Sequence, residues 1–528
     1  HNCVPPFRCW LPSAIISNLG PCLFSTPTPH RRHPPSDRHR HSCIMRCSPP
    51  LPRSPASSPS SFDAPMHAYK TTSPRLAENE KVCVCVVDPY STGAHVSAEA
   101  YYRGFKVLAV WTDECGELES HIPHEVAAID DLYFAQIRYP SAEISTLAAL
   151  SKSISDAAAA ADAKFEHIIA GGESGVKVTE NLSDLLGLRG NSTSGGFENR
   201  RDKKFQQEKV KEAGLRSVRQ LQGTAWTAEV AAFCEQEVPL IIKPVESCGS
   251  DGVKLCKTMG EAEAHFNLLM TGQRKLGAQG AAVLCQEFLQ GKEYVVDCVT
   301  RDGVHKTTFV WVYDKREANG GGFVYFGMVP VPSDDPVAKV LIDYTVGCLD
   351  ALAIANGATH NEIMMTKDGP CLVEVNCRVH GHSGSWLPLT DRCTGGITQV
   401  RSNLDIFVDG AAFDALPAVP RTFVASGTIV MLVSYQEGEE VLATPGFETI
   451  KTLPSFTTIT ESVVVGMPLK LTVDLFDCPG VVVLVHDDAT VIDADLATIR
   501  KLEEECKLFE VAPRKSKARK VDGVISSV

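Results

Sequence analysis

A run of apolar residues at positions 81–88, KVCVCVVD, is the first stretch of the chain with the pattern of a buried strand. A turn over 89–93, a helix over 94–103 and a second apolar strand from Lys106 follow it. A strand, a helix and a strand in this order predict a Rossmann-like βαβ domain, which we place at residues 78–195.

A further strand and helix are expected at 166–170 and 176–186, joined by the turn GGESG at 171–175. A glycine cluster after a strand suggests a nucleotide-binding loop, but the spacing G-x-G-x-x-G is missing here. We therefore interpret the cluster as a tight turn that needs glycine for positive φ angles.

The pattern changes from Asn199, where RRDKKFQQEKVKEAGL predicts a charged helix that ends at Gly214. A strand at 240–244, an apolar run at 281–289 and a helix at 337–355 are expected to follow. We place these elements in a second domain at residues 196–400.

Residues 401–528 are expected to form a β-rich C-terminal region with a terminal helix at 493–508. The basic tail RKSKARK at 514–520 is expected to be a solvated end of the chain. Mixed helices and strands throughout predict an α/β (α+β) fold class, and no internal repeat is evident.

Residues 1–77 differ in composition from the rest of the chain. They hold 15 of the 32 prolines, and nine Lys or Arg against two Asp give them a charge of +7, which leaves −20 for the remainder. We expect a disordered segment, either an untranslated leader before Met45 or Met66, or a transit peptide over 45–77. The second alternative would direct the protein to a plastid or mitochondrion.

The acidic body of the chain excludes nonspecific nucleic-acid binding, which needs clustered Lys and Arg. Several cysteines lie in apolar strands, where a thiol packs as a small hydrophobe: Cys83, Cys85, Cys285, Cys298 and Cys371. No apolar run is long enough to predict a membrane span. We expect a cytoplasmic protein whose partners are small molecules.

The segment NEIMMTKDGPCLVEVN at 361–376 has the pattern of a β-hairpin. A three-residue turn at 367–369, with Gly369 in the left-handed position, would pair Thr366 with Pro370 and Glu362 with Glu374. Two carboxylates directly opposite each other are destabilising, so the pair needs a cation or a raised pKa.

Asn376 follows Glu374 by two residues and therefore faces the same side of its strand. Two carboxylates and an amide oxygen are hard ligands that suit Mg²⁺, or Mn²⁺, shared with substrate phosphates. The alternative is a hairpin with an exposed acidic face, although Ile363, Val373 and Val375 are expected to face the core.

A glycine-rich loop, ESCGSDGV, follows Lys243. Lys243 would add a positive charge at a phosphate site. The small residues of the loop would let backbone N–H groups approach the phosphate, and they are Ser247, Gly249, Ser250 and Gly252. The alternative is an ordinary hairpin turn. At 286–289 the backbone of Glu287, Phe288 and Leu289 could meet an adenine edge, and Glu293 could accept hydrogen bonds from ribose hydroxyls.

Taken in order, Lys203, Lys243 with its loop, QEFLQGKE and HNEI…LVEVNCR resemble the ATP-grasp superfamily. The chain is most similar to its carboxylate-amine ligases, which include L-amino acid ligases and carnosine synthase. The resemblance implies an ATP-grasp fold with a lid at about 219–289 and a large subdomain, and a homodimer is possible by the same resemblance.

The resemblance also implies the roles of the residues. Lys203 and Lys243 would contact the ATP phosphates, Glu287 to Leu289 the adenine, and Glu293 the ribose. Glu362, Glu374 and Asn376 would bind magnesium, while Arg378 would steady the transferred phosphate and the acyl intermediate. Lys203 stands beside Lys204, so this assignment could shift by one residue.

The implied activity is ATP-dependent formation of an acyl phosphate from a carboxylate, which releases ADP. An amine then attacks the acyl phosphate, and phosphate is released. Lys315, Arg316, His380 and Ser383 are candidates for gripping substrate carboxylates. Two alternatives stay open: a carboxylase or purine-type ligase on the same fold, and a catalytically silent ATP-binding regulatory protein.

Overall fold

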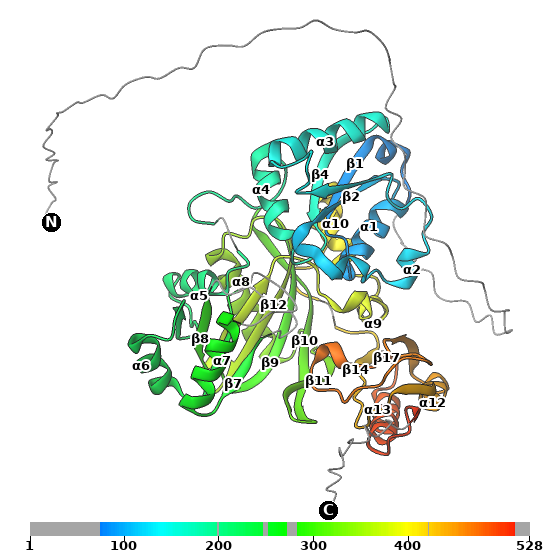
Figure 1. The fold of residues 1–528 in the computed structure, drawn as a ribbon. Helices are drawn as coiled ribbons and strands as arrows, with labels where there is room; N and C mark the ends of the chain where they lie inside the picture. The colour runs from blue at the N-terminus through cyan, green and yellow to red at the C-terminus, as the bar shows by residue number, and fades with distance from the viewer. Residues whose placement is uncertain (1–73, 198–199, 246–251, 272–281, 421, 513–528) are drawn as a thin grey trace, which may run out of the picture. The chain divides into compact units, whose positions relative to one another are not determined.

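The computed structural model describes residues 74–197, 200–245, 252–271, 282–420 and 422–512 (Figure 1). All of them belong to one compact unit, Met66–Val528. The predictions of a leader or transit segment and of a solvated basic tail fall mostly or wholly outside the described residues. No helix in the described part of the chain is long and apolar enough to cross a membrane.

The expected βαβ start is a four-stranded parallel sheet in the order β3-β2-β1-β4. Its strands are β1 (Val82–Val87), β2 (Lys106–Thr112), β3 (Ala135–Tyr139) and β4 (Lys164–Ala170). The helices α1 (Thr92–Tyr102), α3 (Leu147–Ala160) and α4 (Val176–Leu186) connect or follow them. The inner strands β1 and β2 are almost continuously apolar and buried, as in sheets that are covered on both faces, whereas the edge strand β3 alternates between apolar and polar residues.

The segment predicted as a lid forms a second, antiparallel sheet in the order β5-β8-β6-β7. The strands are β5 (Gln220–Gly223), β6 (Leu240–Pro244), β7 (Lys254–Cys256) and β8 (Val283–Glu287). Helices α6 (Ala228–Glu237) and α7 (Met259–Thr271) bury Cys234 and Phe266 with these strands in a separate apolar cluster.

The largest sheet has eight strands in the order β13-β12-β9-β10-β11-β14-β17-β16. Its first half comprises β9 (Gly291–Arg301), β10 (Val304–Ala318), β11 (Gly321–Pro330), β12 (Gly357–Thr366) and β13 (Gly369–Asn376). Its second half comprises β14 (Ser426–Met431), β16 (Phe456–Glu461) and β17 (Gly480–His486). The β-rich region after residue 400 thus continues the sheet that carries the predicted metal hairpin.

Helices α5 (Lys203–Glu212) and α8 (Pro336–Ala351) contact each other and β13. Helix α5 begins after Asp202, whose side chain accepts hydrogen bonds from the N–H groups of Lys204 and Phe205. It ends before Gly214, which has a φ of 77°. The predicted end of α8 at residue 355 is wrong, because the backbone leaves the helix at Leu352 and Ala353 has a φ of 49°.

The remaining elements lie mainly after the hairpin. They are α9 (Leu387–Thr394), α10 (Gln399–Val408), α11 (Gly410–Ala415), α12 (Pro445–Lys451), α13 (Ala489–Glu504), β15 (Glu440–Ala443) and β18 (Glu510–Ala512). Helix α13 begins four residues before the predicted start, because Asp488 caps it by accepting a hydrogen bond from the N–H of Thr490. Helix α10 contacts α1, and a buried ion pair between Arg103 and Asp405 joins them.

Candidate active site

A cavity of about 320 Å³ lies where the parallel sheet, the lid segment and the large sheet meet. Residues separated by hundreds of positions in the sequence line it. Those from the predicted set are Lys203, Lys243, Glu287, Phe288, Leu289, Glu293, Lys315, Glu362, Glu374, Arg378 and His380. The structure therefore brings most of the predicted site residues to one place.

The two predicted phosphate-binding lysines enter the cavity from different elements. Lys203 opens α5, and its Nζ lies 2.9 Å from Glu374 Oε2. Lys243 lies in β6 and is buried. Burial lowers the pKa of Lys243 to about 8, and the positive charge of Lys203 acts in the same direction. Lys204, the alternative assignment, instead pairs with Glu208 at the surface.

The predicted hairpin is present, but its turn is shorter than expected. Thr366 pairs with Gly369 and not with Pro370, so the turn has two residues instead of three. A register shift next to Glu362, with Val373 as the extra residue, restores the predicted pairing of Glu362 with Glu374. The bulge also explains why Val373, expected in the core, lines the cavity together with Glu374.

Asn376 lies beside the carboxylates, as predicted, with its Nδ2 3.2 Å from Glu374 Oε1. Its Oδ1 accepts a hydrogen bond from Arg378, 3.3 Å away. Burial raises the pKa of Glu362, but the hydrogen bond from His360 and the charge of Lys315 outweigh it and lower the pKa to about 2. The hairpin therefore presents an ionised Glu362 at neutral pH.

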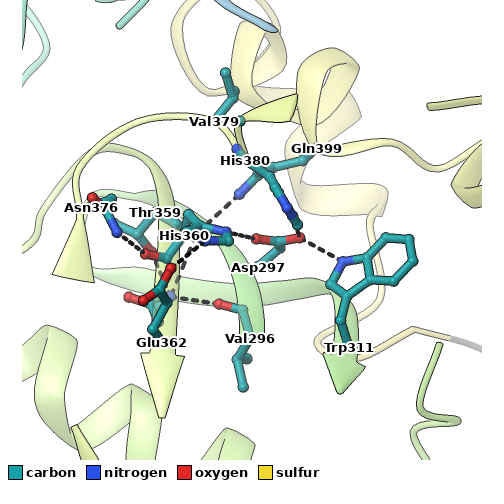
Figure 2. Close-up of polar contacts among 12 residues, drawn as sticks. Val296, Asp297, Trp311, Thr359, His360, Glu362, Asn376, Val379, His380 and Gln399 are labelled. Carbon is teal, nitrogen blue, oxygen red and sulfur yellow. Dashed lines mark hydrogen bonds and ion pairs between the residues drawn. The ribbon is translucent and has the colours of Figure 1, made fainter. Parts of the chain in front are cut away.

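A buried aspartate and two histidines lie next to the hairpin carboxylates, with His360 on β12 itself and Asp297 on the neighbouring strand β9, and the sequence interpretation missed their association (Figure 2). Asp297 Oδ1 lies 3.0 Å from His360 Nδ1, and Asp297 Oδ2 lies 2.8 Å from His380 Nδ1. His360 Nε2 is 3.4 Å from Glu362 Oε1. Burial lowers the pKa of His360, yet its bonds to Asp297 and Glu362 prevail and raise it to about 9. A charged His360 thus supports the acidic Glu362.

The segment predicted to hold adenine lies at the end of β8. Glu287 pairs with Leu240 in the lid sheet, and Glu287, Phe288 and Leu289 all line the cavity. The Glu287 carboxylate is bound by Arg219, whose Nη2 lies 2.6 Å from Oε2. Because Arg219 already binds the Glu287 carboxylate, a ligand would contact the backbone of this segment more than the Glu287 side chain.

Glu293 and Lys315 form a second ion pair in the cavity wall, 2.7 Å apart. Lys315 Nζ also lies 4.7 Å from the ring centre of Tyr313 and 4.3 Å from that of Tyr325. Burial lowers the pKa of Lys315, but the charge of Glu293 outweighs it, and the net shift is upward. Lys315 is therefore a fixed cation in the cavity.

Three members of the predicted glycine loop, Ser247, Gly249 and Ser250, lie outside the described residues. Gly252 is described and has a φ of 73°, in the left-handed region that favours glycine. Among the described residues of this loop, Val253 lines the cavity and Gly252 does not.

The turn 171–175 belongs to the site, which the sequence interpretation missed. Glu173 lines the cavity, and its Oε2 lies 3.2 Å from Arg378 Nε. The prediction of positive φ angles in this turn is wrong. Glycine is required by close approach instead, because a Cβ on Gly172 would lie 2.2 Å from the Tyr90 ring and one on Gly175 would lie 2.6 Å from Val87 O. No nucleotide motif signals Glu173, and only the fold reveals it.

Two of the four candidates for substrate carboxylates do not line the cavity in the described structure. Arg316 pairs with Asp314, 2.7 Å away, and lies over the Phe326 ring. Ser383 contacts the first helix, since its backbone N–H donates to Ser91 Oγ. Lys315 and His380 remain as candidates inside the cavity.

Comparison with known proteins agrees with this arrangement. A family model described as "ATP-grasp domain" matches residues 200–382. Dapdiamide A synthase from Enterobacter agglomerans is 31% identical over 351 residues, which cover 64% of this chain and 79% of that protein. Alanine–anticapsin ligase from Bacillus subtilis is 29% identical over 217 residues, or 38% of this chain and 45% of that protein.

The fold also resembles a solved structure of L-amino acid ligase from Bacillus licheniformis. The TM-score is 0.63 at 16% identity, and the match covers 82% of this chain and 99% of the other. Fold and site together define an ATP-binding ligase with an ATP-grasp domain. This chain belongs to the ATP-grasp carboxylate-amine ligases, which form a C–N bond and release ADP.

Proposed function

We propose that this ligase activates the carboxylate of an amino acid as an acyl phosphate and joins it to the amine of a second small molecule. The observation that carries the proposal is the convergence of Lys203, Lys243, Glu362, Glu374 and Arg378 on one cavity. A carboxylate and a phosphate repel each other, so their reaction needs this density of positive charge beside a cation site.

Lys203 and Lys243 are proposed to hold the ATP phosphates. Lys243 is buried, and the structure gives it a lowered pKa, so an incoming phosphate would supply the negative charge that its ammonium form lacks. Glu287 to Leu289 and Glu293 are proposed to hold the adenosine part, because they continue the same cavity wall.

Glu362, Glu374 and Asn376 fit a magnesium site. Their donor atoms are oxygens, which Mg²⁺ prefers, and the two glutamates are direct partners across the hairpin. A bound Mg²⁺ would neutralise phosphate charge. Lys203 now pairs with Glu374, and that ion pair would exchange partners when nucleotide and cation bind.

Arg378 is proposed to contact the transferred phosphoryl group and the acyl oxygen. It is held from two sides, since its Nε lies 3.2 Å from Glu173 Oε2 and its Nη2 donates to Asn376 Oδ1. This contact links the turn of the parallel sheet to the hairpin of the large sheet. The charge on the leaving phosphate would meet a guanidinium already fixed in position.

Two measurements with pairs of amino acids and amines test the proposal: the release of ADP and the mass of the product. We expect ADP formation that requires both substrates, and a product mass equal to the two substrates minus water. A carboxylase would instead give a product heavier by the incorporated bicarbonate carbon and oxygens. ADP formation that never exceeds the no-substrate background would contradict the proposal.

A further inference from the structure

His380 has one ring nitrogen without a partner, whereas both ring nitrogens of the neighbouring His360 have one. It is 1% exposed and lines the cavity two residues after Arg378. Its Nε2 has no hydrogen-bond partner among the described residues. A buried polar atom without a partner is costly and calls for an explanation.

The other side of the ring is firmly held. His380 Nδ1 lies 2.8 Å from Asp297 Oδ2, which also accepts a hydrogen bond from Trp311 Nε1 at 2.9 Å (Figure 2). The backbone N–H of His380 donates to Gln399 Oε1 at 2.7 Å. The ring is therefore fixed in orientation by its backbone, its Nδ1 and its packing against Trp311 and Trp386.

The hydrogen bond to Asp297 decides which nitrogen carries the proton. The pKa of Asp297 is lowered: burial raises it, but the hydrogen bonds from His360 and His380 and the charge of His360 prevail. An ionised carboxylate only accepts hydrogen bonds, so His380 Nδ1 must donate. Burial lowers the pKa of His380 to about 4, and the charge of His360 adds to this effect. His380 is thus neutral, with its lone pair on Nε2.

The three side chains Asp297, His360 and His380 also have spacings that a metal ion would accept. Their hydrogen bonds favour a role in proton transfer over metal binding. Each carboxylate oxygen of Asp297 already accepts from an imidazole Nδ1, and Oδ2 accepts from Trp311 as well. A metal would have to displace these protons, whereas a proton acceptor needs only the free Nε2.

We propose that His380 Nε2 is the base that takes the proton from the attacking amine. This inference rests on the proposed function. The neutral amine attacks the acyl phosphate carbonyl, the new C–N bond forms, and the ammonium proton of the tetrahedral intermediate passes to Nε2. The C–O bond to phosphate then breaks, and phosphate leaves with the electron pair. His380 returns the proton to the released phosphate, so the ring is neutral again after each turnover.

Asp297 acts on His380 as a positioning residue. It fixes the tautomer and stabilises the imidazolium that forms during the transfer, as the carboxylate of a catalytic triad does. The neighbouring Arg378 is proposed to hold the acyl phosphate, so the base and the electrophile lie on one short segment of chain. The amine would then be positioned between them.

His380→Asn separates this role from a structural one. The asparagine amide nitrogen can keep the hydrogen bond to Asp297, while the Nε2 acceptor is lost.

Two nucleophiles are compared near neutral pH: the amino-acid amine that the wild-type enzyme uses fastest, and hydroxylamine. Hydroxylamine is mostly neutral there and traps acyl phosphates as hydroxamates without help from a base. His124→Asn, an exposed histidine on α2 (His124–Ala127), is the matched control.

We expect His380→Asn to slow amide formation by about 10²- to 10⁴-fold and to leave hydroxamate formation near the wild-type rate. Equal loss of both products, or loss of neither, would overturn the proposal. His380→Gln serves if the first variant does not fold, as judged by its melting curve. Failure of the underlying function is distinguishable, because the wild-type enzyme itself would then form no hydroxamate from ATP and an amino acid.

Discussion

Lys203 Nζ and Glu374 Oε2 lie 2.9 Å apart, one at the start of α5 and the other on β13 of the large sheet. Both side chains are largely buried, so solvent screens the attraction between the two charges less than in a surface pair, and removing either partner would leave the other charge buried and unpaired. We infer that a bound phosphate and cation would lie between these two charges, with the phosphate as the partner of Lys203 and the cation as the partner of Glu374. The first prediction concerns replacement of Glu374, the acidic partner of this pair.

Replacing Glu374 by Gln removes one carboxylate from the proposed magnesium site and the partner of Lys203. Turnover is expected to fall by about 10²-fold or more, because several kcal/mol of transition-state stabilisation depend on the cation. The variant also leaves the buried Lys203 without its charged partner, so the melting temperature should fall, and turnover is measured at a temperature at which the variant is folded. ADP release at a series of Mg²⁺ concentrations measures the effect, with the exposed Glu448→Gln as control. An unchanged rate would refute the metal assignment.

Lys243 predicts a specific pH dependence of ATP binding. Its pKa is lowered to about 8 by burial and by Lys203, and phosphate would raise it in the complex. Binding therefore takes up a proton above pH 8, and affinity should fall by up to about tenfold per pH unit there. Titration calorimetry or nucleotide fluorescence can follow this decline.

Lys243→Arg provides the control for that prediction. The guanidinium stays charged throughout the range, so the loss of affinity above pH 8 should disappear even if overall binding is weaker. A wild-type affinity that is constant from pH 7 to 10 would exclude Lys243 as the titrating contact.

Glu173 is expected to position Arg378. In Glu173→Gln the guanidinium keeps its contact with Asn376 but loses a charged partner. We expect kcat/KM for the carboxylate to fall by about 10²-fold, while KM for ATP stays near its wild-type value. Steady-state kinetics with each substrate varied in turn separates the two. An equal change in both parameters would argue for a general structural effect.

Gly93 tests the close approach of the first helix to the turn at 171–175. A Cβ at this position would lie 2.3 Å from Gly171 O, and a backbone atom cannot move aside easily. Gly93→Ala should therefore destabilise the fold by about 1–3 kcal/mol, read as a lower melting temperature. Gly260→Ala in α7, with open space around its Cβ, should be neutral or slightly stabilising. Equal melting temperatures of the two variants would contradict the packing argument.

Local patterns predicted the strands and helices well where apolar runs were long. Helix α4 and strand β6 have the predicted bounds. The hairpin shows the limit, because one residue too many in the predicted turn was offset by a bulge at Val373 that no local pattern signals. Helix α13 was placed four residues late because the capping role of Asp488 was overlooked.

The lysines, glutamates and Arg378 of the site could be predicted because they lie in recognisable segments. Three other residues of the site could not be predicted: Glu173, Asp297 and His360. Each is recognised as part of the site only through its contact with a residue far along the chain. Asp297 has the pattern of a residue in an apolar strand. The pairing of β9 with β12 places it beside His360, and the segment after β13 brings His380 to its other carboxylate oxygen. Long-range pairing of this kind is fixed by tertiary packing and not by local propensity.

Transfer of ¹⁸O from a labelled carboxylate substrate to inorganic phosphate tests the central claim most directly. If the enzyme forms an acyl phosphate, the C–O bond of that intermediate breaks in the second step. One carboxylate oxygen must then leave with the phosphate in every turnover, and mass spectrometry should find it there. Phosphate that carries no label, while the amide product forms at the normal rate, would contradict the mechanism.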